Sequence, residues 1–171
     1  RFNLLIMQTW EAIVKRRSVR EYLSKEIPQE ILIKIVDAAR LAASARNEQP
    51  WEFVVVTDRE TKGRISRISA PNGAFMAEAG AVIAVFCLDS KYYLEDGCAA
   101  TENILIMAAD LDLGACWVAG DKKPYCREIL ELLGVPEKYK LVSLVSLGYP
   151  KNSPKVISKR KVEEVLHWQA F

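Results

Sequence analysis

Residues 16–20 read RRSVR, and the rest of the chain is best understood by working outward from this stretch. Three guanidinium groups and one hydroxyl lie within five residues, where an expected helix over residues 8–16 gives way to an extended segment. Arginine presents a planar fork of donors that matches two phosphate oxygens, and a neighbouring serine hydroxyl adds a charge-assisted hydrogen bond. The stretch therefore suits an anion. Taken alone, it is more typical of a solvated basic helix end, whose cations interact with the last helix carbonyls.

A helix and a loop with polar amides follow this stretch. Pro28 suits a first helical position, and apolar residues then return on one face, at Ile31, Leu32, Ile35, Val36 and Ala39. Further on, residues 46–58 read RNEQPWEFVVVTD and predict a loop feeding a strand over residues 51–57, because Pro50 disfavours helix at Gln49. Asn47 and Gln49 carry amides that both donate and accept, so they suit the polar edge of a heterocycle. A turn asparagine and an exposed glutamine are the alternative.

The remaining pattern predicts helices alternating with apolar strands. We expect a short helix over residues 59–68 that Gly63 breaks, strands over residues 81–88 and 141–147, and a helix near residues 121–133. The longest helix is expected over residues 94–112, and its middle is apolar on every side. The apolar surface of such a helix is covered either by a second subunit or by the rest of the core of a monomer. The tail turns amphipathic after Lys161, at Val162, Val165, Leu166 and Trp168, so it should pack on something. Strands separated by helices indicate an α/β or α+β sheet sandwiched between helices.

Length, charge and cysteine spacing exclude several classes. The 171 residues, 50% apolar and 27% charged, can bury the core of one domain, which we expect over residues 1–171. A net charge of +2 gives no overall field that would favour nucleic acid or an anionic membrane. The cysteines are too widely spaced for a paired metal-ligand motif, and we expect them to be reduced and mostly buried. They are Cys87, Cys98, Cys116 and Cys126.

The first residues, RFNLLIM, form an apolar run too short for a signal peptide or a membrane span. We expect Met7 to be the natural start, residues 1–6 to be a disordered or non-native leader, and the protein to be cytoplasmic. The chain contains neither GxGxxG nor GxxxxGK[ST], and its one histidine, His167, suits packing near the C-terminus. Without HxxxH or CxxC we expect no metal, and an enzyme with so few reactive side chains would depend on an organic cofactor.

Several motifs in order resemble those of the nitroreductase family of FMN-dependent oxidoreductases. They are RRSVR (16–20), SARNEQPW (44–51), EDGCAATENILIMAADLDLGACWVAG (95–120), GYP (148–150) and SKRKVEEVLHW (158–168). The resemblance extends over residues 8–168. It implies an α+β fold with a mixed, mainly antiparallel central sheet sandwiched by helices. It also implies a homodimer with two FMN sites at the subunit interface, a long interface helix, and a C-terminal arm over residues 150–171 that reaches over the partner.

The resemblance also assigns roles by position. Arg16 and Ser18 match residues that hold the FMN phosphate, and Arg17 falls in the same segment. Arg20 matches a basic residue beside the N1–C2=O edge of the isoalloxazine. Asn47 and Gln49 match amides at the polar edge of the ring. Ala119 and Gly120 match the segment whose backbone approaches N5. Lys159 and Arg160 match a second phosphate clamp that comes from the tail. No side chain is implied as a catalyst, because flavin N5 carries the chemistry.

The implied activity is electron transfer from NAD(P)H to a small organic acceptor, such as a nitroaromatic or a quinone, by a ping-pong mechanism. No nucleic acid or membrane partner is implied. The segment over residues 58–80 is short, so we expect an active site that is open or covered by the partner. Two alternatives stay open: a flavin-binding store or sensor without turnover, and a small basic interaction module that uses residues 16–20 and 151–161.

Overall fold

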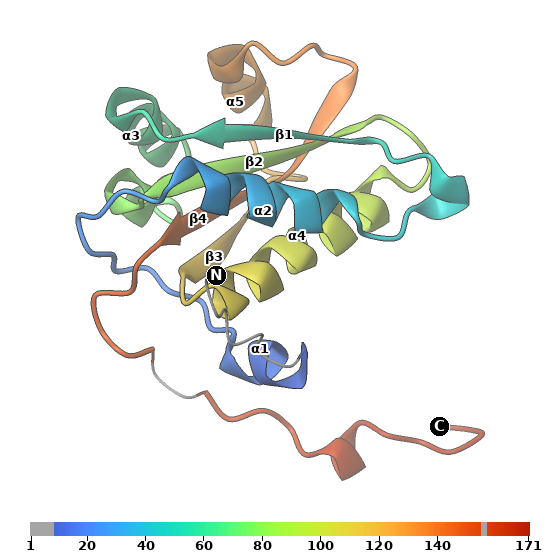
Figure 1. The fold of residues 1–171 in the computed structure, drawn as a ribbon. Helices are drawn as coiled ribbons and strands as arrows, with labels where there is room; N and C mark the ends of the chain where they lie inside the picture. Colours follow the sequence, from blue (N-terminus) through green and yellow to red (C-terminus); the bar gives the residue numbers. More distant parts are fainter. Residues whose placement is uncertain (1–8, 155–156) are drawn as a thin grey trace.

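The computed structural model describes residues 9–154 and 157–171 (Figure 1). The leader expected over residues 1–6 and the start expected at Met7 lie outside the described residues. The helices and strands, with η denoting a 3-10 helix, are in chain order α1 (Thr9–Lys15), α2 (Gln29–Arg40), η1 (Ala45–Asn47), β1 (Trp51–Val56), α3 (Arg59–Ile68), η2 (Ala74–Glu78), β2 (Ala81–Leu88), α4 (Tyr93–Asp110), β3 (Gly114–Ala119), α5 (Cys126–Leu133), β4 (Tyr139–Gly148) and η3 (Val162–Glu164).

The four strands form one sheet in the order β1-β2-β4-β3, and each neighbouring pair is antiparallel. The central strands β2 and β4 are apolar along nearly their whole length, as strands covered on both faces are. Helices α2 and α4 cover one face of the sheet, and α3 and α5 cover the other (Figure 1). The prediction of an α+β sheet sandwiched by helices is confirmed.

Helix α4 is the longest helix of the described chain, as predicted, and it packs closely on the sheet. A Cβ atom added at Gly97 would lie 2.6 Å from Val142 of β4, so only glycine allows this approach. Ile104 and Ala108 are fully buried, whereas Ile106 and Met107 are only partly covered. The subunit therefore covers one side of α4 and leaves part of the other side accessible.

Three details differ from the sequence-based expectations. Residues 114–119 form a strand, β3, that was not predicted; pairing with β4 gives this short run its extended conformation. The following helix begins at Cys126 rather than near residue 121. Gly63 does not break α3, because the Asp58 carboxylate caps the helix by accepting the Thr61 N–H at 2.7 Å, and Ile65 anchors it in the core. The named strands pair antiparallel, and in the described part of the chain the one parallel bridge is the isolated pair Ser18 and Ala115.

The described tail, residues 157–171, extends away from the sheet past α1 (Figure 1). Its apolar side chains are exposed: Val162 by 64%, Val165 by 54%, Leu166 by 45% and Trp168 by 75%. Its polar contacts are internal, as when the Lys161 N–H donates to the Glu164 carboxylate at 3.2 Å. The packing predicted for this amphipathic segment is therefore not made within its own subunit.

All four cysteines are free; Cys87 and Cys116 are buried, and Cys98 and Cys126 are partly buried. Within residues 9–154 and 157–171, none of the helices has both the length and the apolar character that crossing a bilayer requires.

Candidate functional site

The RRSVR segment lies along the outer edge of β3. The Val19 N–H donates to the Ala115 carbonyl at 2.9 Å, and Ser18 forms a parallel bridge with Ala115. Val19 is 7% exposed and packs against Gly114, where an added Cβ would lie 2.7 Å from Val19 Cβ. Side chains alternate along an extended segment, so Ser18 and Arg20 face the surface while Val19 faces the core.

Tyr22 fixes the far end of the same segment. Its hydroxyl donates to the Val19 carbonyl at 2.6 Å and lies 2.7 Å from the Ser146 hydroxyl of β4. Burial raises the pKa of Tyr22 well above its usual value, so the hydroxyl stays protonated. The Leu23 N–H also donates to the Tyr149 carbonyl at 2.8 Å. The segment that carries the arginines is thus held at both ends by the body of the subunit.

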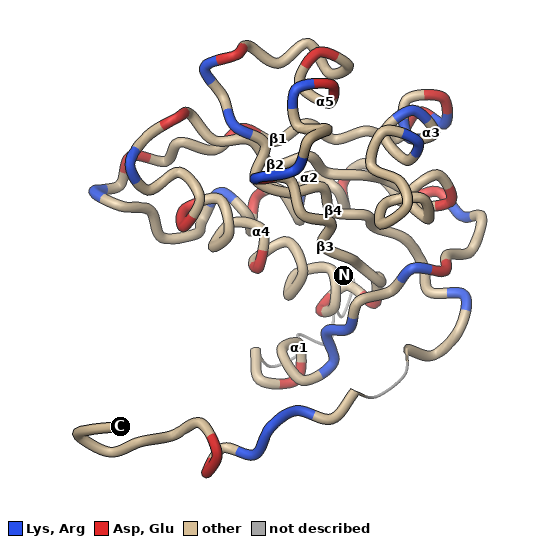
Figure 2. Tube along the Cα trace, turned by 180° about the vertical axis from the view of Figure 1, so that it is seen from behind, with Lys and Arg blue, Asp and Glu red and all other residues tan. Residues whose placement is uncertain are grey.

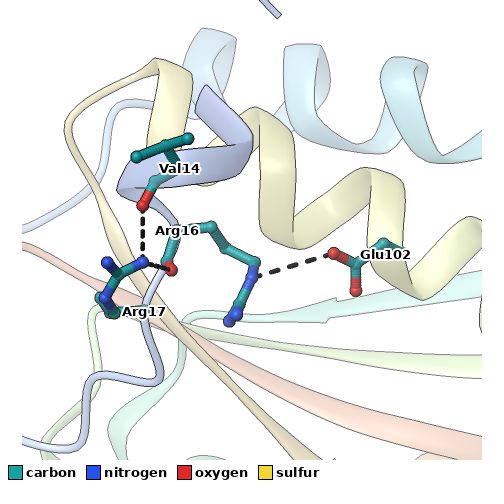
Figure 3. A network of polar contacts seen from close by, with 4 residues as sticks. All are labelled: Val14, Arg16, Arg17 and Glu102. Carbon is teal, nitrogen blue, oxygen red and sulfur yellow. Dashed lines mark hydrogen bonds and ion pairs between the residues drawn. The ribbon is translucent and has the colours of Figure 1, made fainter. Parts of the chain in front are cut away.

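The two adjacent arginine side chains point apart (Figure 3). The Arg16 guanidinium turns toward α4, where its Nε lies 3.9 Å from the Glu102 carboxylate. Arg17 turns back to α1 and donates to the Val14 carbonyl at 2.6 Å and to the Arg16 carbonyl at 2.7 Å. Arg17 therefore caps the C-terminal end of α1, and Arg16 is the arginine of this pair that faces α4.

A cavity of about 300 Å³ lies between this segment and the C-terminal half of α4. Cations line one side of it and apolar side chains of α4 line another. The lining residues are Lys15, Arg16, Arg17, Val19, Leu105, Ala109, Asp112, Leu113, Gly114, Ala115, Pro150 and Pro154. At the rim, the Lys15 ammonium pairs with the Asp112 carboxylate. A cavity with cations beside an apolar wall suits an anionic group attached to an apolar body.

A larger, more open depression of about 550 Å³ lies between α3 and α5, and its walls carry Arg64 and Arg67 facing Glu128 and Glu131. None of the predicted site residues lines it, so the smaller cavity is the better candidate.

The arginines of residues 16–20 affect the pKa of a buried thiol on β3. Burial raises the pKa of the Cys116 thiol, while Arg20, a hydrogen bond from Ser18 and Arg16 all act in the opposite direction. Three of the predicted phosphate- and ring-binding residues therefore lie near one buried atom of β3. Arg20 also lies over the Phe75 ring, with its guanidinium carbon 5.8 Å from the ring centroid.

The end of β3 carries Ala119 and Gly120. The Gly120 N–H donates to the Val142 carbonyl at 3.1 Å, so this N–H is already used within the sheet. Backbone groups of an antiparallel pair alternate in direction, so the Ala119 N–H points away from β4, toward the outer edge. An added Cβ at Gly120 would lie 2.7 Å from the Leu141 side chain, which explains the glycine without a ligand. Of the two residues predicted near N5, only Ala119 presents an outward N–H.

Side chains from α4 and α5 hold this peptide in place. The Tyr125 hydroxyl donates to the Ala119 carbonyl, and the Cys126 thiol donates to the Gly120 carbonyl at 2.6 Å. The Tyr93 hydroxyl donates to the Asp121 carboxylate at 2.5 Å, and this hydrogen bond raises the pKa of Tyr93 to about 12. These anchors were missed from the sequence, because no local pattern marks a tyrosine or a cysteine as a partner of a distant carbonyl.

The predicted loop before β1 is present, and its backbone is unusual. Arg46, Asn47 and Gln49 have positive φ angles of 53°, 58° and 49°. The Gln49 N–H donates to the Ser44 hydroxyl at 3.0 Å, and the Ala45 N–H donates to an Asp96 oxygen at 2.9 Å. The Asn47 and Gln49 side chains are exposed beside the first turn of α4.

Arg17 caps α1, and the Gly120 N–H is used within the sheet. The other predicted residues fall into three groups. Arg16, Ser18, Arg20 and Ala119 lie along one edge of β3. Asn47 and Gln49 lie near Asp96, which is separated from the cavity residue Ala109 by about 20 Å along α4 at a rise of 1.5 Å per residue.

Lys159 and Arg160 form the third group and lie on the exposed tail, where Arg160 Nε is 3.7 Å from the Glu164 carboxylate. Figure 2 shows the tail cations and the cations that follow α1 as two separate blue stretches. No hydrogen bond or ion pair between residues that the structure describes joins one of these groups to another. Among the described residues, His, Cys, Asp and Glu side chains form no group of three that could hold a metal ion.

Comparisons with known proteins identify the family and the fold. A family model described as "Nitroreductase family" matches residues 13–82 and 71–149. A protein of Archaeoglobus fulgidus named "Putative NADH dehydrogenase/NAD(P)H nitroreductase" is 43% identical over 148 residues, covering 82% of this chain and 84% of that protein. A protein of the same name from Methanothermobacter thermautotrophicus is 37% identical over 154 residues, covering 86% of this chain and 80% of that protein.

Among solved structures, the "FMN-dependent Nitroreductase" of Clostridium difficile superposes with a TM-score of 0.89 at 30% identity, covering 95% of this chain and 99% of that chain.

Proposed function

Because this chain belongs to the nitroreductase family, we propose that it is an FMN-dependent oxidoreductase that transfers electrons from NAD(P)H to a small organic acceptor such as a nitroaromatic or a quinone. The observation that carries the proposal is the row of Arg16, Ser18, Arg20 and the Ala119 N–H along the outer edge of β3, beside a cavity with an apolar wall. The donor set suits a molecule with a phosphate at one end and a planar polar ring at the other.

The phosphate end would be held by Arg16 and Ser18. A phosphate monoester carries a charge of about −1.5 to −2 at neutral pH and accepts several hydrogen bonds. Arg16 offers a planar fork of donors, and its pairing with Glu102 at 3.9 Å is loose enough to be exchanged for a phosphate. The Val19 anchor keeps the segment in place, so little order has to be gained when the ligand binds.

The ring end would be held by Arg20 and Ala119. When bound, the flavin would accept a hydride from NAD(P)H and return electrons to the acceptor, with the two substrates using the site in turn. Arg20 would stabilise negative charge at the N1–C2=O edge, which favours the reduced state. The outward Ala119 N–H would orient N5, because Tyr125 and Gly120 fix its neighbouring peptide. No side chain needs to supply a proton, because solvent can protonate the product.

The site would be completed by a second copy of this chain. The Asn47 and Gln49 side chains are exposed and do not line the cavity beside Arg16, and a homodimer would bring the partner's loop to the ring. Exposed apolar side chains support this assembly: Trp10 of α1 is 73% exposed and Trp168 of the tail is 75% exposed. The tail, with Lys159 and Arg160, would pack across the partner. We further propose a cytoplasmic location, with no nucleic acid or membrane as a partner.

The test is a visible spectrum of protein that has been incubated with FMN and freed of unbound FMN by gel filtration, recorded under anaerobic conditions before and after addition of NADH and, separately, NADPH. We expect a yellow protein whose flavin band is bleached by at least one nucleotide and restored by a quinone. A flavin band that neither nucleotide bleaches would contradict turnover and favour the store or sensor. A colourless protein that binds acidic partners in a strongly salt-dependent way would instead favour the basic module.

A further inference from the structure

Asp96 carries a buried carboxylate in the first turn of α4. The residue is only 5% exposed, and one of its oxygens accepts the Ala45 N–H at 2.9 Å. The other oxygen, Oδ2, has no hydrogen-bond partner among the described residues. A buried carboxylate oxygen without a partner opposes folding, so a role beyond packing is needed to explain the residue.

The charge of Asp96 does not serve α4 alone. An acidic residue near a helix N-terminus is favourable, but Glu95 already supplies one there in an exposed position. The Asp96 charge instead acts on the interior: burial and then the nearby Asp96 carboxylate raise the pKa of Cys87 to about 12.

The loop that Asp96 holds is strained. Arg46, Asn47 and Gln49 all have positive φ angles, which cost energy in residues other than glycine. Such conformations persist only where the surroundings hold them.

The anchors of this loop are few. Two hydrogen bonds lie within the loop and move with it. The Asn47 N–H donates to the Ser44 carbonyl at 3.0 Å, and the Gln49 N–H donates to the Ser44 hydroxyl at 3.0 Å. At the C-terminal end, β2 takes over, because the Leu88 N–H donates to the Pro50 carbonyl at 2.9 Å. In the described residues, the Ala45–Asp96 hydrogen bond is the tie between the N-terminal end of the loop and α4.

We propose that Asp96 is a positioning residue that, through the Ala45 N–H, fixes the direction in which the Asn47 and Gln49 amides face the polar edge of the flavin ring. This inference rests on the proposed function. Asp96 itself touches neither flavin nor substrate. It sets the orientation of two amides that recognise a ring edge with alternating donors and acceptors.

The test compares three single variants with the parent protein. Asp96→Ala removes the acceptor; Asp96→Asn keeps an acceptor oxygen in the same place but removes the charge. Glu95→Ala removes the neighbouring charge of the same helical turn and serves as the matched control. Two readouts are needed: hydrogen exchange of amides 45–49 in the flavin-free protein, and FMN affinity by quenching of flavin fluorescence.

We expect Asp96→Ala to lower loop protection and FMN affinity, each about tenfold, because one charge-assisted hydrogen bond is lost. Asp96→Asn should retain most of both, and Glu95→Ala should change neither. Parent-like exchange and affinity in Asp96→Ala would overturn the proposal, and so would Asp96→Asn as defective as Asp96→Ala.

A further variant covers the case in which Asp96→Ala does not fold. Ala45→Pro removes only the N–H donor, at the first position of a 3-10 helix, where proline is tolerated, and after Ser44 with the extended φ and ψ of −133° and 151° that proline favours. It should lower FMN affinity as Asp96→Ala does; unchanged affinity would overturn the proposal. If the parent protein binds no FMN, the proposed function fails, and the exchange readout still tests the tie between Asp96 and the loop.

Discussion

Two basic segments are proposed to meet the same phosphate, and the chain fixes them in opposite ways. Residues 16–20 are held by the body of the subunit: Val19 is 7% exposed and bonds to Ala115, and Tyr22 closes the far end. Within the described part of the chain, residues 157–171 form hydrogen bonds only with one another, and Trp168 is 75% exposed. If both segments hold the phosphate as proposed, the difference teaches that one half of the site is preorganised by its own subunit, whereas the other half would be ordered by a partner.

The largest effect should come from the fixed segment. Arg16→Ala removes up to two charge-assisted hydrogen bonds to the phosphate, so we expect FMN affinity to fall about 100-fold, or about 2.7 kcal/mol. The matched control is Arg17→Ala, which removes a guanidinium bonded to the Val14 carbonyl of α1 and to the Arg16 carbonyl; it should lower the free energy of unfolding and leave FMN affinity within about threefold. Fluorescence titration measures both affinities, and an equal loss in the two variants would break the comparison.

The next effect should come from the tail. Trp168→Ser removes a large exposed aromatic side chain, so we expect the dimer dissociation constant to rise about 30-fold, by about 2 kcal/mol. The free energy of unfolding of the body should not change, because Trp168 makes no core contact there. Sedimentation equilibrium measures the dimer, and Val55→Ser on β1 is a control that also removes an exposed apolar side chain. A parent-like dimer in Trp168→Ser would show that the tail packs elsewhere.

A smaller loss of FMN affinity is expected when the tail cations Lys159 and Arg160 are removed. Lys159→Ala with Arg160→Ala should weaken FMN binding about tenfold, and the loss should shrink at high salt, because exposed charges are screened. This effect is smaller than that of Arg16→Ala, since the tail must be ordered before it binds.

Mixing the two defective proteins sharpens the same comparison. If the tail serves the partner's site, a heterodimer of Arg16→Ala with Lys159→Ala/Arg160→Ala contains one site with both defects and one intact site. Titration of the mixture should then recover a high-affinity class of FMN sites that neither parent variant has. A mixture with no such class would mean that each tail serves its own subunit.

The smallest effect is a dependence of the free energy of unfolding on pH, and it arises in the sheet and helices rather than in the tail. Burial raises the pKa of Cys87 from 9.0 to about 12. Above pH 9 the unfolded thiol ionises while the folded thiol does not, so the folded state loses stability as pH rises, by about 1 kcal/mol between pH 9 and 10. Cys87→Ala should flatten this loss in urea denaturation at pH 7, 9 and 10. Residues 157–171 contain neither cysteine nor tyrosine, so they should add nothing to it.

The elements that sequence periodicity could reveal are those with a buried face of their own. The face of α2 that carries Ile35 was predicted, and Ile35 is fully buried. The apolar runs of β2 and β4 were predicted as strands, and both lie at the centre of the sheet. Strand β3 was missed because its conformation comes from pairing with β4, not from a strong preference within ACWVAG.

Parts of the candidate site could not be read from local sequence. Arg16 and Arg17 are equivalent in RRSVR, yet one faces α4 and the other caps α1, since neighbours distant in the chain decide the direction of each. Asp96 gave no signal, because its partner Ala45 lies 51 positions away. The phosphate and ring roles of the named residues stay predictions until the flavin-binding variants are measured.

If the tail packs on a second copy of this chain, as proposed, FMN occupancy is linked to dimer assembly by mass action. Diluting the protein below its dimer dissociation constant would release cofactor together with the partner, and added FMN would drive the halves back together. Specific activity should therefore fall at low enzyme concentration and recover with excess FMN. Turnover per subunit would then depend on the concentration of this chain.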